Sequence, residues 1–261
     1  MGKMSRRELL SLSGPAAIGS VMGAGVFAGA ATKDATDPVK RLKIIVFGAH
    51  PDDPETGCGG AMLLFSRAGH EVISAYLTRG EAGIEGKSFA EAANIRTREA
   101  LEACKILGAR PEFLGQIDGN CEINQKRYQD IYNFLQKEKP DLLFTHWPID
   151  SHRDHRVCSL LVYDAWLRLG RQCPFYYYEV MTGSQSQNFY PTHYIDITTT
   201  VTEKHDASFS HVSQDVQAWY ETDVERVQVF RGMEYGCKYA EAFIKHAQSP
   251  EVIFSKMTGS R

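Results

Sequence analysis

The chain has 261 residues, of which 43% are hydrophobic and 23% are charged, and its formal net charge is −3 at pH 7. This length and this hydrophobic content suit one globular α/β domain with a sizeable core. Because there is no basic excess, composition gives no support for a nucleic-acid-binding surface.

The first thirty residues are predicted to be an export signal rather than part of the fold. Basic residues, Lys3, Arg6 and Arg7, precede a mildly apolar stretch at residues 9–27. Ala-Gly-Ala at 28–30 fits a cleavage site of the A-x-A type. The segment SRRELL resembles a twin-arginine export signal, so we expect a periplasmic or extracellular protein. An uncleaved amphipathic anchor is the alternative.

A polar leader is expected at residues 31–41, followed by one domain at residues 42–261 in which strand and helix patterns alternate. Apolar runs without polar alternation are typical of strands buried on both faces. Thr56 is the expected cap of the first helix, and Ser88 with Glu91 fits a capping box for the second. In chain order, we expect a strand at 42–47, a helix at 57–69, a strand at 71–78, a helix at 88–107, a strand at 112–114, a helix at 124–138, a strand at 141–145, a helix at 151–169, strands at 175–181 and 192–197, and helix from 198 onward. This alternation predicts a single doubly wound, mostly parallel sheet of the Rossmann-like type.

Two of the expected strands are followed by loops rich in histidine and aspartate. The first strand leads into His-Pro-Asp-Asp at residues 50–53, and the strand at 141–145 leads into HWPIDSHRDHR at residues 146–156. Ligands of such sheets bind beyond the carboxyl ends of strands, where neighbouring loops meet. Imidazole and carboxylate groups around one point form a ligand set that zinc prefers. The two loops therefore predict a metal centre.

The same stretches resemble a known family. AHPDD at 49–53, GCGG at 57–60 and HRDH at 152–155 are similar to motifs of the LmbE/PIG-L family of zinc-dependent de-N-acetylases. LTRGEAGI at 77–84 and the R-x-R-E segment at 96–99 lie where such proteins carry comparable stretches. The resemblance implies an LmbE-like three-layer α/β/α fold and a Zn²⁺ cofactor, with another divalent metal such as Fe²⁺ also compatible. It further implies removal of an N-acetyl group from an N-acetylglucosamine-type or related amide substrate.

The resemblance also implies a role for each motif residue. The matching metal ligands are His50, Asp53 and His155. Asp52 matches the general base that accepts the proton of a metal-activated water. His152, in its protonated form, matches the group that stabilises the oxyanion, and Asp154 matches the acid that supports His152.

Several of these residues have a structural alternative. Ser151-x-x-Asp154 also fits a helix-capping box. Arg79, after the second strand, is expected to contact substrate hydroxyls, with a simple pairing to Glu81 as the alternative. His146 is expected to pack at its strand end and is left out of the catalytic set.

The glycine motif at 57–60 does not supply the spacing of a dinucleotide-binding loop. We expect its glycines to permit close backbone approach and tight helix packing. One departure from the family pattern is Pro54 followed by Glu55, where many relatives place an acid directly after AHPDD. This departure leaves the substrate unsettled.

Other functions and properties stay open. An amidase acting on a sugar-thiol conjugate would use the same chemistry, and a non-catalytic, metal-stabilised carbohydrate-binding protein is a different class. No membrane span is expected in the mature form, and a homo-oligomer is left open. The six cysteines lack a C-x-x-C pair and are expected to be free and mostly buried.

Overall fold

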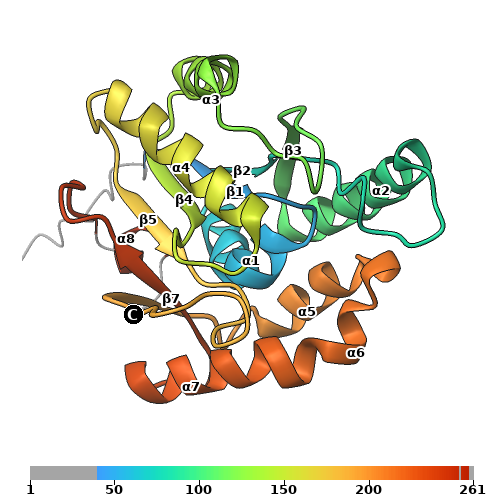
Figure 1. Cartoon of the computed structure of the whole chain (residues 1–261). Helices are drawn as coiled ribbons and strands as arrows, with labels where there is room; N and C mark the ends of the chain where they lie inside the picture. Colours follow the sequence, from blue (N-terminus) through green and yellow to red (C-terminus); the bar gives the residue numbers. More distant parts are fainter. Residues whose placement is uncertain (1–39, 253, 259–261) are drawn as a thin grey trace, which may run out of the picture. The chain divides into compact units, whose positions relative to one another are not determined.

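A seven-stranded sheet with the order β3-β2-β1-β4-β5-β7-β6 forms the centre of the structure (Figure 1). The computed structural model describes residues 40–252 and 254–258. The strands are β1 (Lys43–Gly48), β2 (Glu71–Tyr76), β3 (Ala109–Phe113), β4 (Leu142–His146), β5 (Phe175–Tyr178), β6 (His193–Asp196) and β7 (Ala240–Lys245). Strands β1 to β5 are mutually parallel, whereas β7 runs antiparallel to both β5 and β6. The predicted mostly parallel sheet is confirmed.

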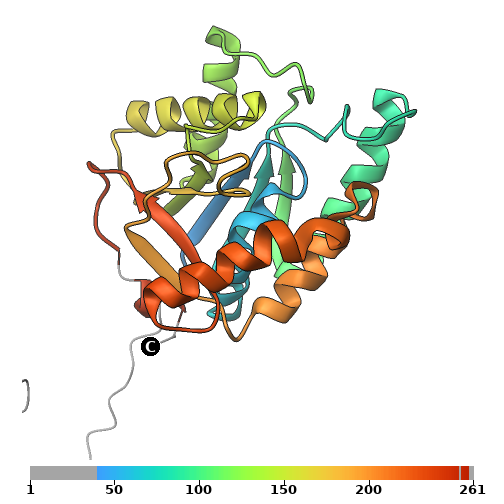
Figure 2. The same cartoon turned by 60° about the horizontal axis from the view of Figure 1, so that its bottom comes forward.

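Helices cover both faces of this sheet. They are α1 (Asp53–Arg67), α2 (Phe89–Leu107), α3 (Gln125–Glu138), α4 (Arg153–Arg168), α5 (Val201–Phe209), α6 (Val216–Tyr220), α7 (Arg226–Tyr235) and α8 (Phe254–Thr258). One core joins α3 and α4 to the sheet, and the other joins α1, α5 and α8 to its opposite face. Figure 2 shows the orange and red helices α5 to α7 lying on the second side. The three-layer arrangement is the predicted one.

Residues of β1 explain how one strand serves both cores. Ile44 and Val46 belong to the core on the α1 side, while Ile45 and Phe47 belong to the core on the α4 side. Successive side chains of a strand point to opposite faces, so a strand buried on both faces has to be apolar throughout.

The strand order places a crevice between the ends of β1 and β4. The chain proceeds outward from β1 through β2 to β3 and then returns to place β4 on the other side of β1. Connections that leave β1 and β4 therefore diverge to opposite faces of the sheet, α1 to one and α4 to the other. Such a switch in strand order is where doubly wound sheets bind their ligands.

The C-terminal part differs from the expectation of continuous helix after Thr198. Helices α5 to α7 are present, but residues 240–245 form strand β7. The sequence AEAFIK contains good helix formers. Pairing with β5 and β6 overrides this local preference, and β7 buries Phe243 and Glu241. Propensity is a weak guide where neighbouring strands supply the hydrogen bonds.

The predicted signal at residues 1–30 and most of the leader at residues 31–41 lie outside the described residues. Within the described residues, no helix combines the length and the apolar character that a membrane crossing requires. All six cysteines fall in the described part of the chain and are free, and four of them are buried.

Candidate active site

The His-Pro-Asp-Asp loop turns the chain from β1 directly into α1. The helix begins at Asp53, so Asp52, not Thr56, is the N-cap, which corrects the expected start. Pro54 lies in the first turn, where its missing N–H costs nothing. The displaced acid Glu55 accepts a hydrogen bond from the Asp52 backbone N–H at 3.1 Å. The departure from the family pattern thus becomes a helix-capping contact.

The second loop runs from β4 into α4. His152 is the N-cap of α4, and its Nδ1 accepts the backbone N–H of Asp154 at 3.2 Å. The capping box of Ser151 with Asp154 is therefore absent from this helix start. Asp150 fixes the loop by accepting the backbone N–H of His152 at 2.7 Å.

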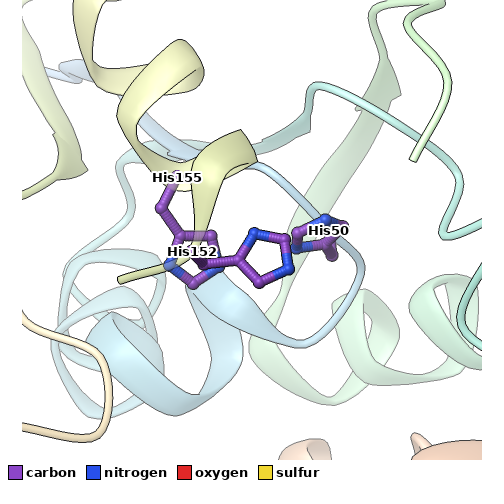
Figure 3. A group of neighbouring side chains, drawn as sticks. All are labelled: His50, His152 and His155. Atoms are coloured by element: carbon purple, nitrogen blue, oxygen red, sulfur yellow. The ribbon is translucent and has the colours of Figure 1, made fainter. Parts of the chain in front are cut away.

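The two loops meet at the carboxylate of Asp53. Its Oδ2 lies 3.4 Å from His50 Nδ1, and its Oδ1 lies 3.3 Å from His155 Nε2. The three residues predicted to hold a metal are thus brought together. Figure 3 shows His50, from the loop after β1, facing His152 and His155, from the start of α4. The ring centroids of His50 and His152 are 4.7 Å apart, and those of His152 and His155 are 4.6 Å apart.

These side chains also satisfy a geometric requirement for metal binding. Nitrogen atoms of His50, His152 and His155 lie within 4.8 Å of one another, as do ligand atoms of Asp53, His146 and His155. Imidazole nitrogens and a carboxylate are ordinary ligands of divalent zinc or iron. The residues present therefore fit such a cation.

A second layer of carboxylates stands behind the histidines. Asp118, in the loop after β3, lies 3.0 Å from His50 Nε2, and Asp150 lies 3.2 Å from His155 Nδ1. A carboxylate behind a metal-binding histidine fixes its ring orientation and its tautomer. The sequence did not single out either residue, although Asp150 lies within the histidine-rich stretch at 146–156 and Asp118 follows the strand expected at 112–114.

His146 is also part of this layer, contrary to its expected role as a packing residue alone. It is fully buried, and its ring stacks on that of His155 with centroids 4.0 Å apart. Its Nε2 lies 3.2 Å from Asp53 and accepts the Ala49 backbone N–H at 3.0 Å. His146 therefore ties the end of β4 to the loop after β1.

Asp154 has other partners than the predicted one. Its Oδ2 accepts the backbone N–H of Gly119 at 2.7 Å and lies 3.5 Å from His50 Nε2. The contact with His152 runs through the Asp154 backbone instead. In this structure, the Asp154 carboxylate supports His50.

Charge around the cluster is strongly negative, and the pKa shifts follow from it. Burial alone would lower the pKa of His155, but Asp53 and Asp150 raise it to about 9. Burial would raise the pKa of Asp53, but His155 and His146 hold it well below its usual value. The acidic surroundings thus favour positive charge on the His155 imidazole, as they would favour a cation beside it.

Asp52 and His152 differ from these ligand candidates. Burial raises the pKa of Asp52 to about 6, against the opposing charge of Arg96, which suits a base that works near neutral pH. Burial and the neighbouring His50 and His155 lower the pKa of His152. Because its Nδ1 is an acceptor, neutral His152 carries its proton on Nε2. The expected protonated form is therefore not the one that this environment favours.

A cavity of about 410 Å³ opens above the cluster. Its polar wall contains Asp52, His152, Asp118 and Arg96. The rest of the lining includes Val180, Met181, Gln185, Gln214 and Trp219. The sequence did not indicate these residues, because they come from the segment after β5 and from the helical C-terminal part.

Arg79 is not among the residues that line this cavity. Its side chain lies against α2, where Nε donates to Thr97 at 2.8 Å and a terminal nitrogen donates to Asn94 at 3.1 Å. Its backbone N–H donates to Glu81 at 3.2 Å. Arg96 is the arginine that reaches the cavity.

The GCGG stretch serves close packing, as expected. A Cβ added to Gly60 would stand 2.6 Å from Ile197, and one added to Gly59 would stand 3.1 Å from Lys204. The backbone N–H of Gly60 donates to Glu241 on β7 at 2.8 Å. These glycines therefore let α1 approach the C-terminal part behind the cavity.

Comparisons with known proteins agree with this arrangement. Residues 45–166 match the family model described as PIG-L, GlcNAc-PI de-N-acetylase. The chain is 28% identical over 219 residues to the diacetylchitobiose deacetylase of Thermococcus kodakarensis, covering 76% of this chain and 81% of that protein. It is also 28% identical over 142 residues to the uncharacterized deacetylase YaiS of Escherichia coli, covering 52% of this chain and 71% of that protein.

A solved structure gives the same result. The N,N'-diacetylchitobiose deacetylase from Pyrococcus horikoshii, complexed with its inhibitor MPG, superposes with a TM-score of 0.71 at 26% identity. The match covers 84% of this chain and 91% of that one. The family-model match at residues 45–166 contains both motif loops, so sequence, fold and site agree. The chain belongs to the PIG-L/LmbE family of deacetylases, which are hydrolases.

Proposed function

We propose that this deacetylase removes the N-acetyl group from an N-acetylglucosamine-type or related amide substrate in a metal-dependent reaction. One observation carries the proposal: His50, Asp53 and His155 converge beside the half-buried acid Asp52, and all four line a cavity of about 410 Å³. That volume lies in the range of small-molecule sites.

His50, Asp53 and His155 would hold the cation, with Asp118 and Asp150 orienting the two imidazoles. A divalent cation bound there would polarise the amide carbonyl and lower the pKa of a coordinated water.

Asp52 accepts a proton from the water that adds to the carbonyl carbon. The Nε2–H of neutral His152 donates a hydrogen bond to the carbonyl oxygen as negative charge develops on it. Asp52 then returns the proton to the nitrogen as the C–N bond breaks. Acetate and a free amine leave, so one water is consumed for each amide cleaved.

The apolar and amide side chains that line the cavity support a sugar as the carrier of the acetyl group. A sugar ring has an apolar C–H face, which packs on an indole or on aliphatic side chains, and hydroxyls that bond to amides. Trp219 is held by a hydrogen bond from its Nε1 to the Gln214 carbonyl at 3.2 Å. Oε1 of Gln185 is buried without a partner among the described residues, so it is available to a hydroxyl. Two of the relatives named above are diacetylchitobiose deacetylases.

A substrate panel tests this proposal. Release of free amine and acetate would be measured with N-acetylglucosamine, diacetylchitobiose, an N-acetylated sugar-thiol conjugate and an acetyl-lysine peptide. We expect turnover of the sugar compounds and none of the peptide. Preference for the thiol conjugate would favour the alternative amidase. Binding of the sugars without any product after long incubation would contradict the proposal and indicate a carbohydrate-binding protein.

We also propose that the protein is exported through its twin-arginine-type signal. Arg6→Lys with Arg7→Lys should then retain the precursor inside the cell, as measured by fractionation and N-terminal sequencing. Equal export of the double variant would contradict this route.

A further inference from the structure

The backbone of Asp52 has an unusual conformation. Its φ is 113° and its ψ is −29°, a left-handed region that favours glycine. A residue other than glycine keeps such a conformation when its surroundings hold it there, and such residues are frequent at active sites. The groups that hold Asp52 therefore bear on how its carboxylate is placed.

Arg96 on α2 holds the loop from one side. A single terminal nitrogen of its guanidinium donates to Asp52 Oδ2 at 2.8 Å and to the Pro51 carbonyl at 2.5 Å. The side chain is almost fully buried. Gly80 and Gly83 leave room for it, because a Cβ on either glycine would collide with the guanidinium. Arg96 thus binds both the carboxylate of Asp52 and the carbonyl of the peptide group that precedes Asp52.

Glu55 holds the loop from the other side. Its Oε2 accepts the Asp52 backbone N–H at 3.1 Å, and its Oε1 accepts the hydroxyl of Tyr76 on β2. His211 lies 3.7 Å from the same carboxylate. Glu55, Tyr76 and His211 are all fully buried. A carboxylate accepts from the Asp52 N–H and from the Tyr76 hydroxyl, whereas an amide has one acceptor oxygen and would bond to Tyr76 only with the direction of that hydrogen bond reversed.

We propose that Arg96 and Glu55, with Tyr76 behind Glu55, are positioning residues that hold Asp52 in the left-handed conformation and aim its carboxylate at the reacting water. The inference rests on the proposed function, because it acts through Asp52 as the general base. Arg96 and Glu55 come from different helices. Arg96 binds the carboxylate of Asp52, and Glu55 binds its backbone N–H. Neither one needs to touch the substrate.

Single variants test the arrangement through the division between kcat and KM. We expect kcat to fall about 100-fold in Arg96→Met and about tenfold in Arg96→Lys, which keeps the charge but not the planar geometry. Glu55→Gln should lower kcat about tenfold and Tyr76→Phe several-fold. KM should stay within about twofold, and bound metal should stay at the wild-type amount.

Two control variants separate positioning from general damage. Tyr176→Phe removes the hydroxyl of another fully buried tyrosine, one without a hydrogen-bond partner among the described residues. Arg110→Lys alters an arginine that pairs with Glu138 on the far edge of the sheet. Both should keep wild-type kcat. A general loss of stability would lower the folded fraction and leave the kcat of the folded enzyme unchanged.

A double-mutant cycle decides whether Arg96 and Glu55 act through Asp52. Adding Arg96→Met or Glu55→Gln to Asp52→Asn should cost less than about a further threefold in kcat. The full single-variant loss in the Asp52→Asn background would overturn this inference and leave the proposed function standing. Wild-type turnover by Asp52→Asn would instead refute the role of the base itself.

Crystal structures give a readout that needs no substrate. The Glu55→Gln and Arg96→Met variants should show Asp52 with a different φ or with its carboxylate turned from the cavity. An Asp52 unchanged in both variants would overturn the inference, whatever substrate the enzyme uses.

Discussion

Asp52 and Asp53 are neighbours in the His-Pro-Asp-Asp loop, but Asp52 is assigned the role of general base and Asp53 that of a metal ligand. This assignment can be tested. Asp52→Asn should keep the metal, because Asp52 is not among the proposed ligands, but should lose roughly 10²–10⁴-fold in kcat with the loss of the base. His155→Ala should lose the metal itself. Metal content by atomic emission, measured beside acetate release, checks both. Equal metal loss in the two variants would refute the division of roles.

Asp150 offers a second test at this scale. It lies 3.2 Å from His155 Nδ1 and accepts the His152 backbone N–H, so it orients the imidazole. Asp150→Asn should weaken metal affinity by about 10- to 100-fold, measured by competition with a chelator. Asp130→Asn, at an exposed pair with Lys126, is the matched control and should bind metal like the wild type. Unchanged affinity in Asp150→Asn would show that His155 is oriented by other contacts.

Among the elements, the segment between α5 and α7 contributes Gln214 and Trp219 to the lining of the cavity. Ser213 is tied to Glu99 on α2 at 2.8 Å, and Gln214 is tied to the Gly83 carbonyl at 3.0 Å. A π-helix at Glu221–Glu225 follows α6, and such turns are frequent near functional sites. The segment is therefore fixed to α2 and to the loop after β2, and it holds Trp219 at the cavity.

Trp219 gives the prediction for this element. Trp219→Ala should raise KM for an N-acetylated sugar about tenfold and change kcat by less than about threefold, because the ring contacts ground state and transition state alike. Trp219→Phe keeps an aromatic face and should recover most of the affinity. A drop in kcat with unchanged KM would show that Trp219 acts on the chemistry rather than on sugar binding.

For the whole molecule, the Lys204–Glu241 pair links α5, β7 and the GCGG start of α1. Lys204 Nζ lies 2.6 Å from Glu241, and both residues are almost fully buried. Glu241 also accepts the backbone N–H groups of Gly60 and Ala61. These contacts hold α1 in place, and the first turn of α1 carries Asp53 of the candidate metal site.

Lys204→Met should reduce the free energy of unfolding by about 3–5 kcal/mol, because it leaves a buried carboxylate without its counter-charge. Arg67→Met breaks the exposed pair with Glu203 and should cost less than about 1 kcal/mol. Urea unfolding of both variants measures the difference. Similar losses would mean that the buried pair contributes no more than a surface pair.

Prediction from sequence succeeded where the signal is local. The apolar run of β1 and the capping box of Ser88 with Glu91 are properties of residues close together in the sequence. The strand order then brought the two motif loops together at the switch point between β1 and β4.

Prediction failed where the structure depends on distant partners. Strand β7 is set by its pairing with β5 and β6, and Asp118 reaches His50 across the sheet edge. Asp52 as the N-cap depends on Glu55, whose second oxygen is fixed by Tyr76 on another strand. A local sequence pattern does not indicate which distant residues will come into contact.

The measurement that tests the central claim most directly is acetate release from N-acetylglucosamine derivatives by wild-type protein before metal removal, after complete removal, and after addition of Zn²⁺ or Fe²⁺. The account predicts that activity disappears with the metal and returns with it, because His50, Asp53 and His155 converge for that ion. Undiminished activity in the fully metal-free protein would contradict it.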